Sequence, residues 1–229
     1  MSEVIFMRMR RKKNLDTRLE NCADNLFEIH SDELNFNIAA QKKEYLDFAA
    51  IFGNDNPLIL EIGCGKGQFA CEFALLHPEY NIIAVEKYGN VIVQACEKAK
   101  AAGIKNVFFI KGMAEYLPKY IPDGVIERIY LNFSCPFPKS KYASHRLTHK
   151  RFLEIYKPLM SKDAEIHQKT DNMHFFEFSI QSLSQNGFKL KNISLDLHNS
   201  GIEENIVTEY ENRFASMGMP IYRLEAYID

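Results

Sequence analysis

An apolar run that ends in three glycines at alternate positions most constrains the fold of this chain. The run covers residues 58–62, and Gly63, Gly65 and Gly67 follow it. Apolar residues then recur at helical spacing, so we expect a buried strand, a tight glycine turn and a helix. Glycine permits positive φ and close approach of a ligand, and a helix N-terminus offers unpaired N–H groups. We therefore expect a nucleotide-like ligand at this turn.

A second aliphatic run narrows the choice of ligand. It covers residues 81–85 and ends in Glu86, about 20 residues after the turn, where an acid binds ribose hydroxyls in dinucleotide folds. The glycine spacing differs from G-x-G-x-x-G, because the residues from Glu61 to Gly67 read E-x-G-x-G-x-G. That pattern resembles the first motif of class I S-adenosylmethionine-dependent methyltransferases. The resemblance implies S-adenosylmethionine as the cofactor.

Composition bounds the class of protein. With 229 residues and 46% apolar residues, the chain suits a single domain with a substantial core. The net charge of −2 means that a polyanion would need a local patch. The five cysteines include no C-x-x-C pair, which argues against a disulfide framework or a zinc site. Without a signal-like or membrane-spanning apolar run, we expect a cytoplasmic protein that binds no membrane, either a monomer or a homodimer.

Strands and helices alternate from residue 57 onward, which predicts an α/β domain with a mainly parallel, Rossmann-like sheet covered on both faces. We expect the first five strands near residues 58–62, 81–86, 106–110, 127–133 and 164–169. We expect the helices near residues 67–76, 88–102, 147–160 and 173–186. An antiparallel hairpin over 188–197 and 221–227 would complete seven strands. Residues 1–19 form a basic arm and residues 20–56 a helical cap, with one helix over 38–52, in a single domain of residues 1–229.

Two stretches concentrate positive charge. The first lies near the N-terminus and contains Arg8, Arg10, Arg11, Lys12 and Lys13. The second lies between residues 128 and 153, has no acidic residue, and contains Lys139, Lys141, Arg146, Lys150 and Arg151. Cation runs are often only solvated, but positive charge just after a strand favours a polyanionic substrate.

Three segments that follow strands carry candidate site residues. In the loop after the fourth strand, two prolines should hold Cys135 and Phe137 in extended backbone. Asp171 follows the fifth strand, where a helix N-cap is the simpler explanation. Residues 205–214 have the spacing of an amphipathic helix, whose carboxylates would then form a solvated face.

Together these motifs resemble the bacterial tRNA (guanine-N7)-methyltransferase family over nearly the whole chain. The matching segments are residues 8–11, 61–67, 130–134, 136–139, 146–148, 169–172, 195–200, 208–211 and 220–223. The resemblance implies that the cofactor is bound by Glu61, Gly63, Gly65, Gly67, Glu86, Met113, Ala114 and Cys135. It implies that a guanosine in the tRNA variable loop is bound by Lys139, Asp171, Thr208, Glu209, Tyr210 and Glu211. The cations named above would contact the tRNA backbone.

The chain departs from the family's pattern in two places. In the proline loop, Cys135 stands where an aspartate is usual and Phe137 where a tryptophan is usual; after the third strand, Met113 stands where an acid is frequent. Cys135 therefore takes the position of a catalytic residue. A thiol is mostly neutral at pH 7 and accepts hydrogen bonds poorly. The alternative is a protein that binds S-adenosylmethionine and tRNA with weak or lost catalysis.

The chemistry suits these residue types. Guanine N7 is a lone-pair acceptor, so its methylation needs orientation and electrostatics but no general base. Glu211 could accept from the N–H groups of guanine, and Tyr210 could stack on the base. A nicotinamide-dependent oxidoreductase is a third hypothesis, which the glycine spacing disfavours and an NADH titration tests.

Overall fold

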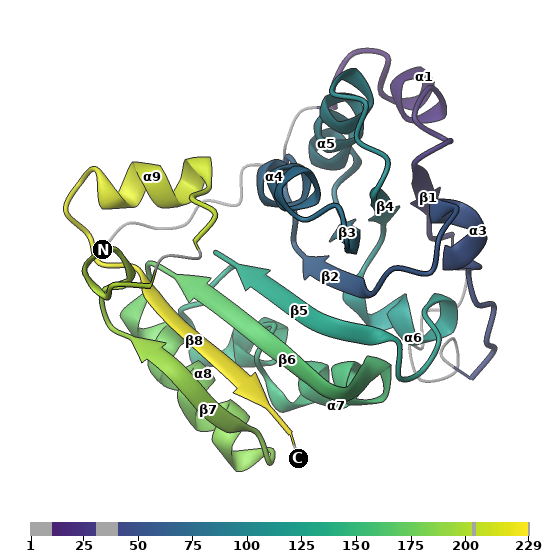
Figure 1. The fold of residues 1–229 in the computed structure, drawn as a ribbon. Coiled ribbons are helices and arrows are strands. Elements are labelled where there is room, and N and C mark those ends of the chain that lie inside the picture. Colours follow the sequence, from purple (N-terminus) through teal and green to yellow (C-terminus); the bar gives the residue numbers. More distant parts are fainter. Residues whose placement is uncertain (1–10, 31–40, 203–204, 229) are drawn as a thin grey trace.

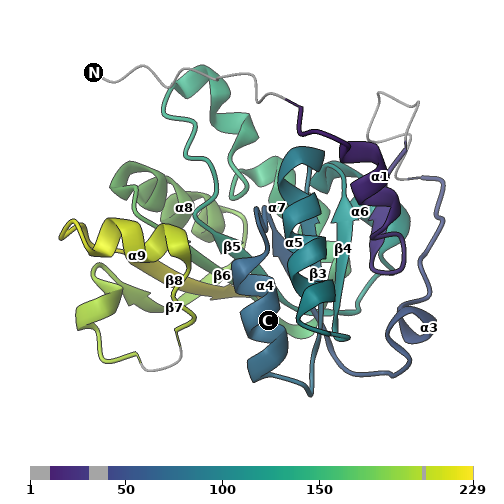
Figure 2. The same ribbon diagram turned by 90° about the horizontal axis from the view of Figure 1, so that it is seen from above.

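The computed structural model describes residues 11–30, 41–202 and 205–228, which form one sheet with helices on both faces (Figure 1, Figure 2). The strands are β1 (Leu26–Glu28), β2 (Leu58–Ile62), β3 (Asn81–Glu86), β4 (Val107–Lys111), β5 (Ile126–Asn132), β6 (Met160–Thr170), β7 (Lys189–Ser194) and β8 (Tyr222–Tyr227). The α-helices are α1 (Leu15–Glu20), α3 (Phe48–Phe52), α4 (Gln68–Leu76), α5 (Gly89–Ala101), α6 (Leu117–Tyr120), α7 (Lys150–Leu159), α8 (Met173–Gln185) and α9 (Glu209–Ala215). Short 3-10 turns are η1 (Ala114–Tyr116), η2 (Ser140–His145) and η3 (Leu197–Asn199).

The sheet confirms the predicted α/β class. Its strand order is β1-β4-β3-β2-β5-β6-β8-β7, and neighbours from β1 through β6 pair in parallel. The predicted hairpin is confirmed too, since β8 pairs antiparallel with β7, but β8 also pairs with β6 and so lies between them. The sheet has eight strands and not seven, because the sequence pattern missed β1. A strand of three residues is too short to show a period of two.

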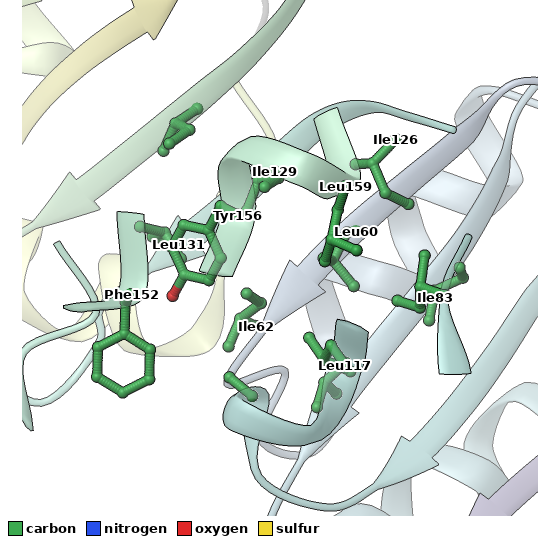
Figure 3. Packing of buried hydrophobic residues seen from close by; sticks show 14 of the residues in the cluster. Leu60, Ile62, Ile83, Leu117, Ile126, Ile129, Leu131, Phe152, Tyr156 and Leu159 are labelled. Atoms are coloured by element: carbon green, nitrogen blue, oxygen red, sulfur yellow. The ribbon is translucent and has the colours of Figure 1, made fainter. Parts of the chain in front are cut away.

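The central strands are mostly apolar because both of their faces are covered. All five residues of β2 are buried. Leu60 and Ile62 pack with residues of α6 and α7, in the cluster drawn in Figure 3, while Ile59 packs with α4 and α5 on the other face. The two clusters hold the strand ends in fixed positions, and the loops that follow those ends can therefore carry a precise site.

The helix predicted over residues 38–52 is wrong for most of its described length. Only α3 is helical; it begins after Asp47, whose side chain accepts from the N–H of Ala50, and it ends at Gly53 with φ 70°. Residues 44–46 instead run beside the end of α6. The N–H groups of Glu44 and Leu46 donate to backbone carbonyls there, at 2.7 and 2.9 Å, so they are not available to a helix. Residues 31–40 lie outside the described part.

No helix in the described ranges combines the length and the apolar character needed to cross a bilayer.

Candidate active site

A cavity of about 360 Å³ opens at the carboxyl ends of the central strands. β3 lies on one side of β2 and β5 on the other, so the loops that follow these strands diverge and leave a crevice. The carboxyl ends of four strands contribute residues to the cavity wall, including Gly63 after β2, Glu86 at the end of β3, Met113 after β4 and Cys135 after β5. The expectation that functional candidates lie just after strands is met by all four.

The three glycines of the turn have different physical roles. Gly63, Gly65 and Gly67 all have positive φ, at 85°, 57° and 72°. Gly63 lines the cavity, and a Cβ there would meet only open space, so the main chain is accessible to a ligand. A Cβ on Gly67 would lie 2.5 Å from the Cβ of Ala95. Gly67 is therefore needed for the packing of α4 against α5, and neither it nor Gly65 lines the cavity.

Glu86 is presented to the cavity as a held, partly desolvated carboxylate. One of its oxygens accepts a 2.9 Å hydrogen bond from the N–H of Tyr88, and burial raises the pKa of the side chain. Met113 and Ala114, which follow β4, form an apolar part of the same wall. A carboxylate beside an apolar wall suits a nucleoside, which presents hydroxyl donors and a flat base.

Glu61 lies behind the cavity and does not line it. The side chain is 2% exposed, and the Asn132 amide donates to its Oε1 at 3.1 Å. Burial raises the pKa of Glu61 to about 7, against the opposing effects of that hydrogen bond and of the charge on Lys169. Within the described chain, Glu61 Oε2 and Asn132 Oδ1 are buried without a hydrogen-bond partner, as is the hydroxyl of the cavity residue Ser134.

The proline loop has a conformation that the sequence did not predict. Cys135 is exposed and lines the cavity, but Phe137 has φ 42°, so its predicted extended backbone is wrong. The reason is Arg146, whose guanidinium donates to the carbonyls of Pro136 at 2.9 Å and Phe137 at 3.0 Å. Arg146 also lies over the ring of Phe178, 4.4 Å from its centroid. Arg146 therefore fixes the backbone of the proline loop. Burial lowers the pKa of its guanidinium group.

The other cations of the second basic stretch divide into paired and exposed groups. Arg151 makes an ion pair with Glu115, a buried residue that lines the cavity. Lys150 lies 3.6 Å from Glu154 on the helix surface. Lys139 and Lys141 are exposed before and within η2.

The described end of the basic arm is docked beside the cavity. The N–H of Lys12 donates to the Asn90 side chain, near the start of α5, at 2.9 Å. Lys87 and Tyr88, just before α5, line the cavity. Arg11 pairs with Asp16, and Lys13 is exposed. Arg8 and Arg10 lie outside the described residues.

The segment after η3 confirms the predicted helix but not its solvated acidic face. Glu211 of α9 is 0% exposed and lies 2.7 Å from the ammonium of Lys169. Thr208 caps the helix by accepting from the N–H of Glu211, at 3.1 Å. Glu209 is exposed, and its N–H donates to Gln68 of α4.

Tyr210 and Asp171 lie on the outer side of this region. Tyr210 is 49% exposed, and its ring centroid is 5.4 Å from that of the cavity residue Phe133. Asp171 is half-buried after β6, and burial raises its pKa. Burial raises the pKa of Tyr210, and the charge of Asp171 adds to that effect. The two side chains are therefore close enough to interact. No described side chain forms a salt bridge with Asp171 within 4.0 Å; the N-cap of α8 is Asn172 and not Asp171.

Sequence reasoning missed Lys169, Asn132 and Glu115 as parts of this region. Lys169 and Asn132 are neighbours in the register of β5 and β6. The signal was available, because a polar residue at the last buried position of a strand demands a partner. Glu115 follows β4 by a few residues and supplies an acid close to where Met113 lacks one.

Comparisons with known proteins give methyltransferases as relatives over most of the chain. Residues 55–224 match a family model described as a putative methyltransferase. The tRNA (guanine-N(7)-)-methyltransferase of Geobacillus kaustophilus is 48% identical over 176 residues, covering 77% of this chain and 81% of that protein. The enzyme of the same name from an Exiguobacterium species is 42% identical over 220 residues, covering 96% and 97%. The chain belongs to the tRNA (guanine-N7)-methyltransferase family.

Solved structures with low sequence identity show the same fold. The 16S rRNA methyltransferase KamB aligns with a TM-score of 0.60 at 16% identity, covering 82% of this chain and 95% of that one. A precorrin-6y C5,15-methyltransferase from Geobacter metallireducens aligns with a TM-score of 0.54 at 13% identity, covering 88% and 94%. This member of the tRNA methyltransferase family therefore has the fold of class I methyltransferases.

The residues around the cavity fit S-adenosylmethionine, the cofactor of this methyltransferase family. Glu86 faces the space with a carboxylate that suits ribose hydroxyls, and Gly63 leaves its main chain open. Within the described chain, the buried hydroxyl of the cavity residue Ser134 has no hydrogen-bond partner, which matches a ligand with polar groups, and the unpaired oxygens of Glu61 and Asn132 lie behind that wall. Cys135 is also at the cavity wall, where this methyltransferase lacks the usual aspartate.

Proposed function

We propose that this enzyme transfers a methyl group from S-adenosylmethionine to N7 of a guanosine in the variable loop of tRNA. One juxtaposition carries the proposal. Phe133 belongs both to the wall of the cavity and to a ring pair with the exposed Tyr210. A cofactor cavity and an aromatic surface for an unstacked base therefore meet at one residue.

The cavity residues bind the cofactor by charge and shape. S-adenosylmethionine, when bound, supplies an electrophilic methyl group on a sulfonium. Glu86 would hold the ribose, and Met113 and Ala114 would pack against the adenine. Glu61 would act from behind the turn through its charge, which attracts the cationic cofactor, because its side chain is buried and does not line the cavity. Cys135 would contact the cofactor through its sulfur, which is only a weak hydrogen-bond acceptor.

The residues of the rim orient the guanosine. Guanine N7 already has a lone pair, so the chain needs no residue that removes a proton. Tyr210 and Phe133 offer ring faces to the base, which fixes the direction of N7. Methylation leaves a positive charge on the guanine, and Asp171 is a carboxylate near Tyr210 that forms no salt bridge with the described residues. Asp171 would stabilise that charge as it develops.

The tRNA backbone would meet the exposed lysines and the arm. Lys139 and Lys141 are exposed just after the proline loop, Lys150 is exposed at the start of α7, and Lys13 is exposed before α1. Arg146 and Arg151 would contribute through the loop and the cavity wall that they hold, because their guanidinium groups are engaged there. The proposal leaves Thr208 as the cap of α9, whose first turn carries Glu209 and Tyr210.

Transfer of a labelled methyl group to unmodified tRNA tests the proposal, with the modified nucleoside identified by mass spectrometry. We expect label in 7-methylguanosine. Label in another nucleoside would overturn the assignment of N7. The second candidate function, a binder of S-adenosylmethionine and tRNA with weak or lost catalysis, is motivated by Cys135. Binding of both ligands with no label would favour it.

A further inference from the structure

Lys169 binds one segment of the chain with all of its donors. It lies near the end of β6 and is 6% exposed. Its ammonium donates to the side chain of Asn205 at 2.8 Å, to the carbonyl of Ile206 at 2.8 Å and to Glu211 at 2.7 Å. A lysine ammonium has three N–H donors, so each has an acceptor. All three acceptors belong to residues 205–211.

Both carboxylate oxygens of Glu211 also have partners. One carboxylate oxygen meets Lys169, and the other accepts from the Asn205 amide at 2.6 Å and lies 3.2 Å from His198. The sequence Thr-x-x-Glu has the pattern of a capping box, and Thr208 does cap α9. The Glu211 carboxylate, however, bonds to residues outside the helix. It attaches the helix to the sheet and to η3.

The helix has little else to attach it. α9 is only seven residues long, and Glu211 is its one buried residue. A helix of this length is not stable by itself in water, and most surface helices are held by an apolar face. Among the described residues, α9 also makes the bond from Glu209 to Gln68 and the ring pair of Tyr210 with Phe133. The buried ion pair is therefore the main anchor of α9.

We propose that Lys169 is a positioning residue for the methyl transfer. By anchoring α9 at the carboxyl edge of the sheet, it places the ring of Tyr210 beside Phe133 at the wall of the cavity. Lys169 also lies 5.9 and 6.0 Å from the ring centroids of Phe69 and Phe133 and acts on the charge of Glu61, so it stands between the cofactor turn and the rim. The inference rests on the proposed function, because it takes the guanosine as the group that meets this ring.

The test compares Lys169→Met with Lys119→Met. Methionine keeps the length of the side chain and removes the ammonium. Lys119 is a matched control, since it pairs with Glu44 at 3.0 Å, lies 5.2 Å from the Tyr120 ring and does not line the cavity. Amide hydrogen exchange reports whether α9 is released. The KM for tRNA and the Kd for S-adenosylmethionine, both measured by standard titrations, report which ligand depends on that position.

We expect Lys169→Met to speed exchange over residues 208–216 while β2 stays protected. We expect the KM for tRNA to rise about 10- to 100-fold, as for a misplaced orienting group, while the Kd for S-adenosylmethionine changes less than about twofold. Lys119→Met should leave all three values unchanged. Unchanged exchange over 208–216, or an equal loss of cofactor affinity, would overturn the proposal, the second because it indicates a general structural role.

A second variant keeps the proposal testable if Lys169→Met does not fold. Asn205→Ala removes one acceptor of Lys169 and the amide donor to Glu211, and it leaves the ion pair between Lys169 and Glu211 intact. We expect the same two changes in smaller measure, with a rise in the KM for tRNA of about threefold to tenfold, because two hydrogen bonds are lost while the ion pair remains. No change in either value overturns the proposal. If the wild-type enzyme does not methylate tRNA, the proposed function fails, whereas the exchange data still decide whether Lys169 anchors α9.

Discussion

The amide of Asn132 donates a 3.1 Å hydrogen bond to Glu61 and leaves the other oxygen of that buried carboxylate unpaired among the described residues. This pair joins the ends of β5 and β2 directly behind the cofactor turn. A carboxyl group held in this way titrates near neutrality, since burial raises the pKa of Glu61 to about 7. Its charge state can therefore change within the range of ordinary assays.

We predict that the affinity for S-adenosylmethionine rises with pH between about 6 and 8. Ionised Glu61 attracts the cationic cofactor and protonated Glu61 does not, so affinity falls by up to about tenfold for each pH unit below the pKa of about 7. Calorimetric titrations at several pH values measure this dependence. Glu61→Gln should bind weakly at every pH and show a flat profile. A wild-type profile that is equally flat would contradict the role of Glu61.

The same shift predicts the sign of a stability change. The folded-state pKa of Glu61 lies above the ordinary value of 4.5 for a glutamate, so the folded protein binds more protons than the unfolded chain between about 4.5 and 7. Stability without cofactor should therefore decrease as pH rises through that window. Glu61→Gln should lose this decrease, which thermal unfolding at pH 5 and pH 7 can measure.

Glu86 provides a test of the cofactor site that does not involve the core. Glu86→Gln keeps the shape of the side chain but removes the charge that would accept from the ribose hydroxyls. We expect the Kd for S-adenosylmethionine to rise about 10- to 100-fold, as for the loss of charge-assisted hydrogen bonds worth about 1.5–3 kcal/mol. The melting temperature without cofactor should stay close to that of the wild type. An unchanged Kd would remove Glu86 from the site.

Much of this site follows from local sequence patterns, and the part that does not is made by long-range contacts. Glu86 and the glycine turn are encoded by strand ends and spacing, so the sequence predicted them. Glu211 was misread as solvated because its partner, Lys169, is distant in the chain and adjacent only in space. The hydrogen bonds of Arg146 could not be predicted for the same reason, since its acceptors are backbone carbonyls that no side-chain pattern reveals.

Variants of Cys135 and Asp171 test whether a carboxylate near the cavity is needed for catalysis, and at which of the two positions. Asp171→Asn should lower kcat about 10- to 100-fold, because it removes a charge that stabilises the cationic product. Cys135→Asp should raise kcat, since it places a carboxylate at the cavity wall. The double variant should recover part of the activity lost in Asp171→Asn. Cys135→Ser is the control for size, and no gain from Cys135→Asp would mean that other groups have replaced the family's aspartate.

A salt titration of tRNA binding should distinguish two kinds of cation in the basic stretch after β5: exposed lysines that contact phosphate and an arginine that holds the proline loop. Lys139→Ala and Lys141→Ala remove exposed cations, so each should reduce the slope of log affinity against log salt by about one if the lysine contacts a phosphate. Arg146→Ala should instead destabilise the fold by about 1–3 kcal/mol, because two backbone carbonyls of the proline loop lose their donor. Its salt slope, measured below the melting temperature, should remain that of the wild type. A reduced slope for Arg146→Ala, with unchanged stability, would return Arg146 to the tRNA interface.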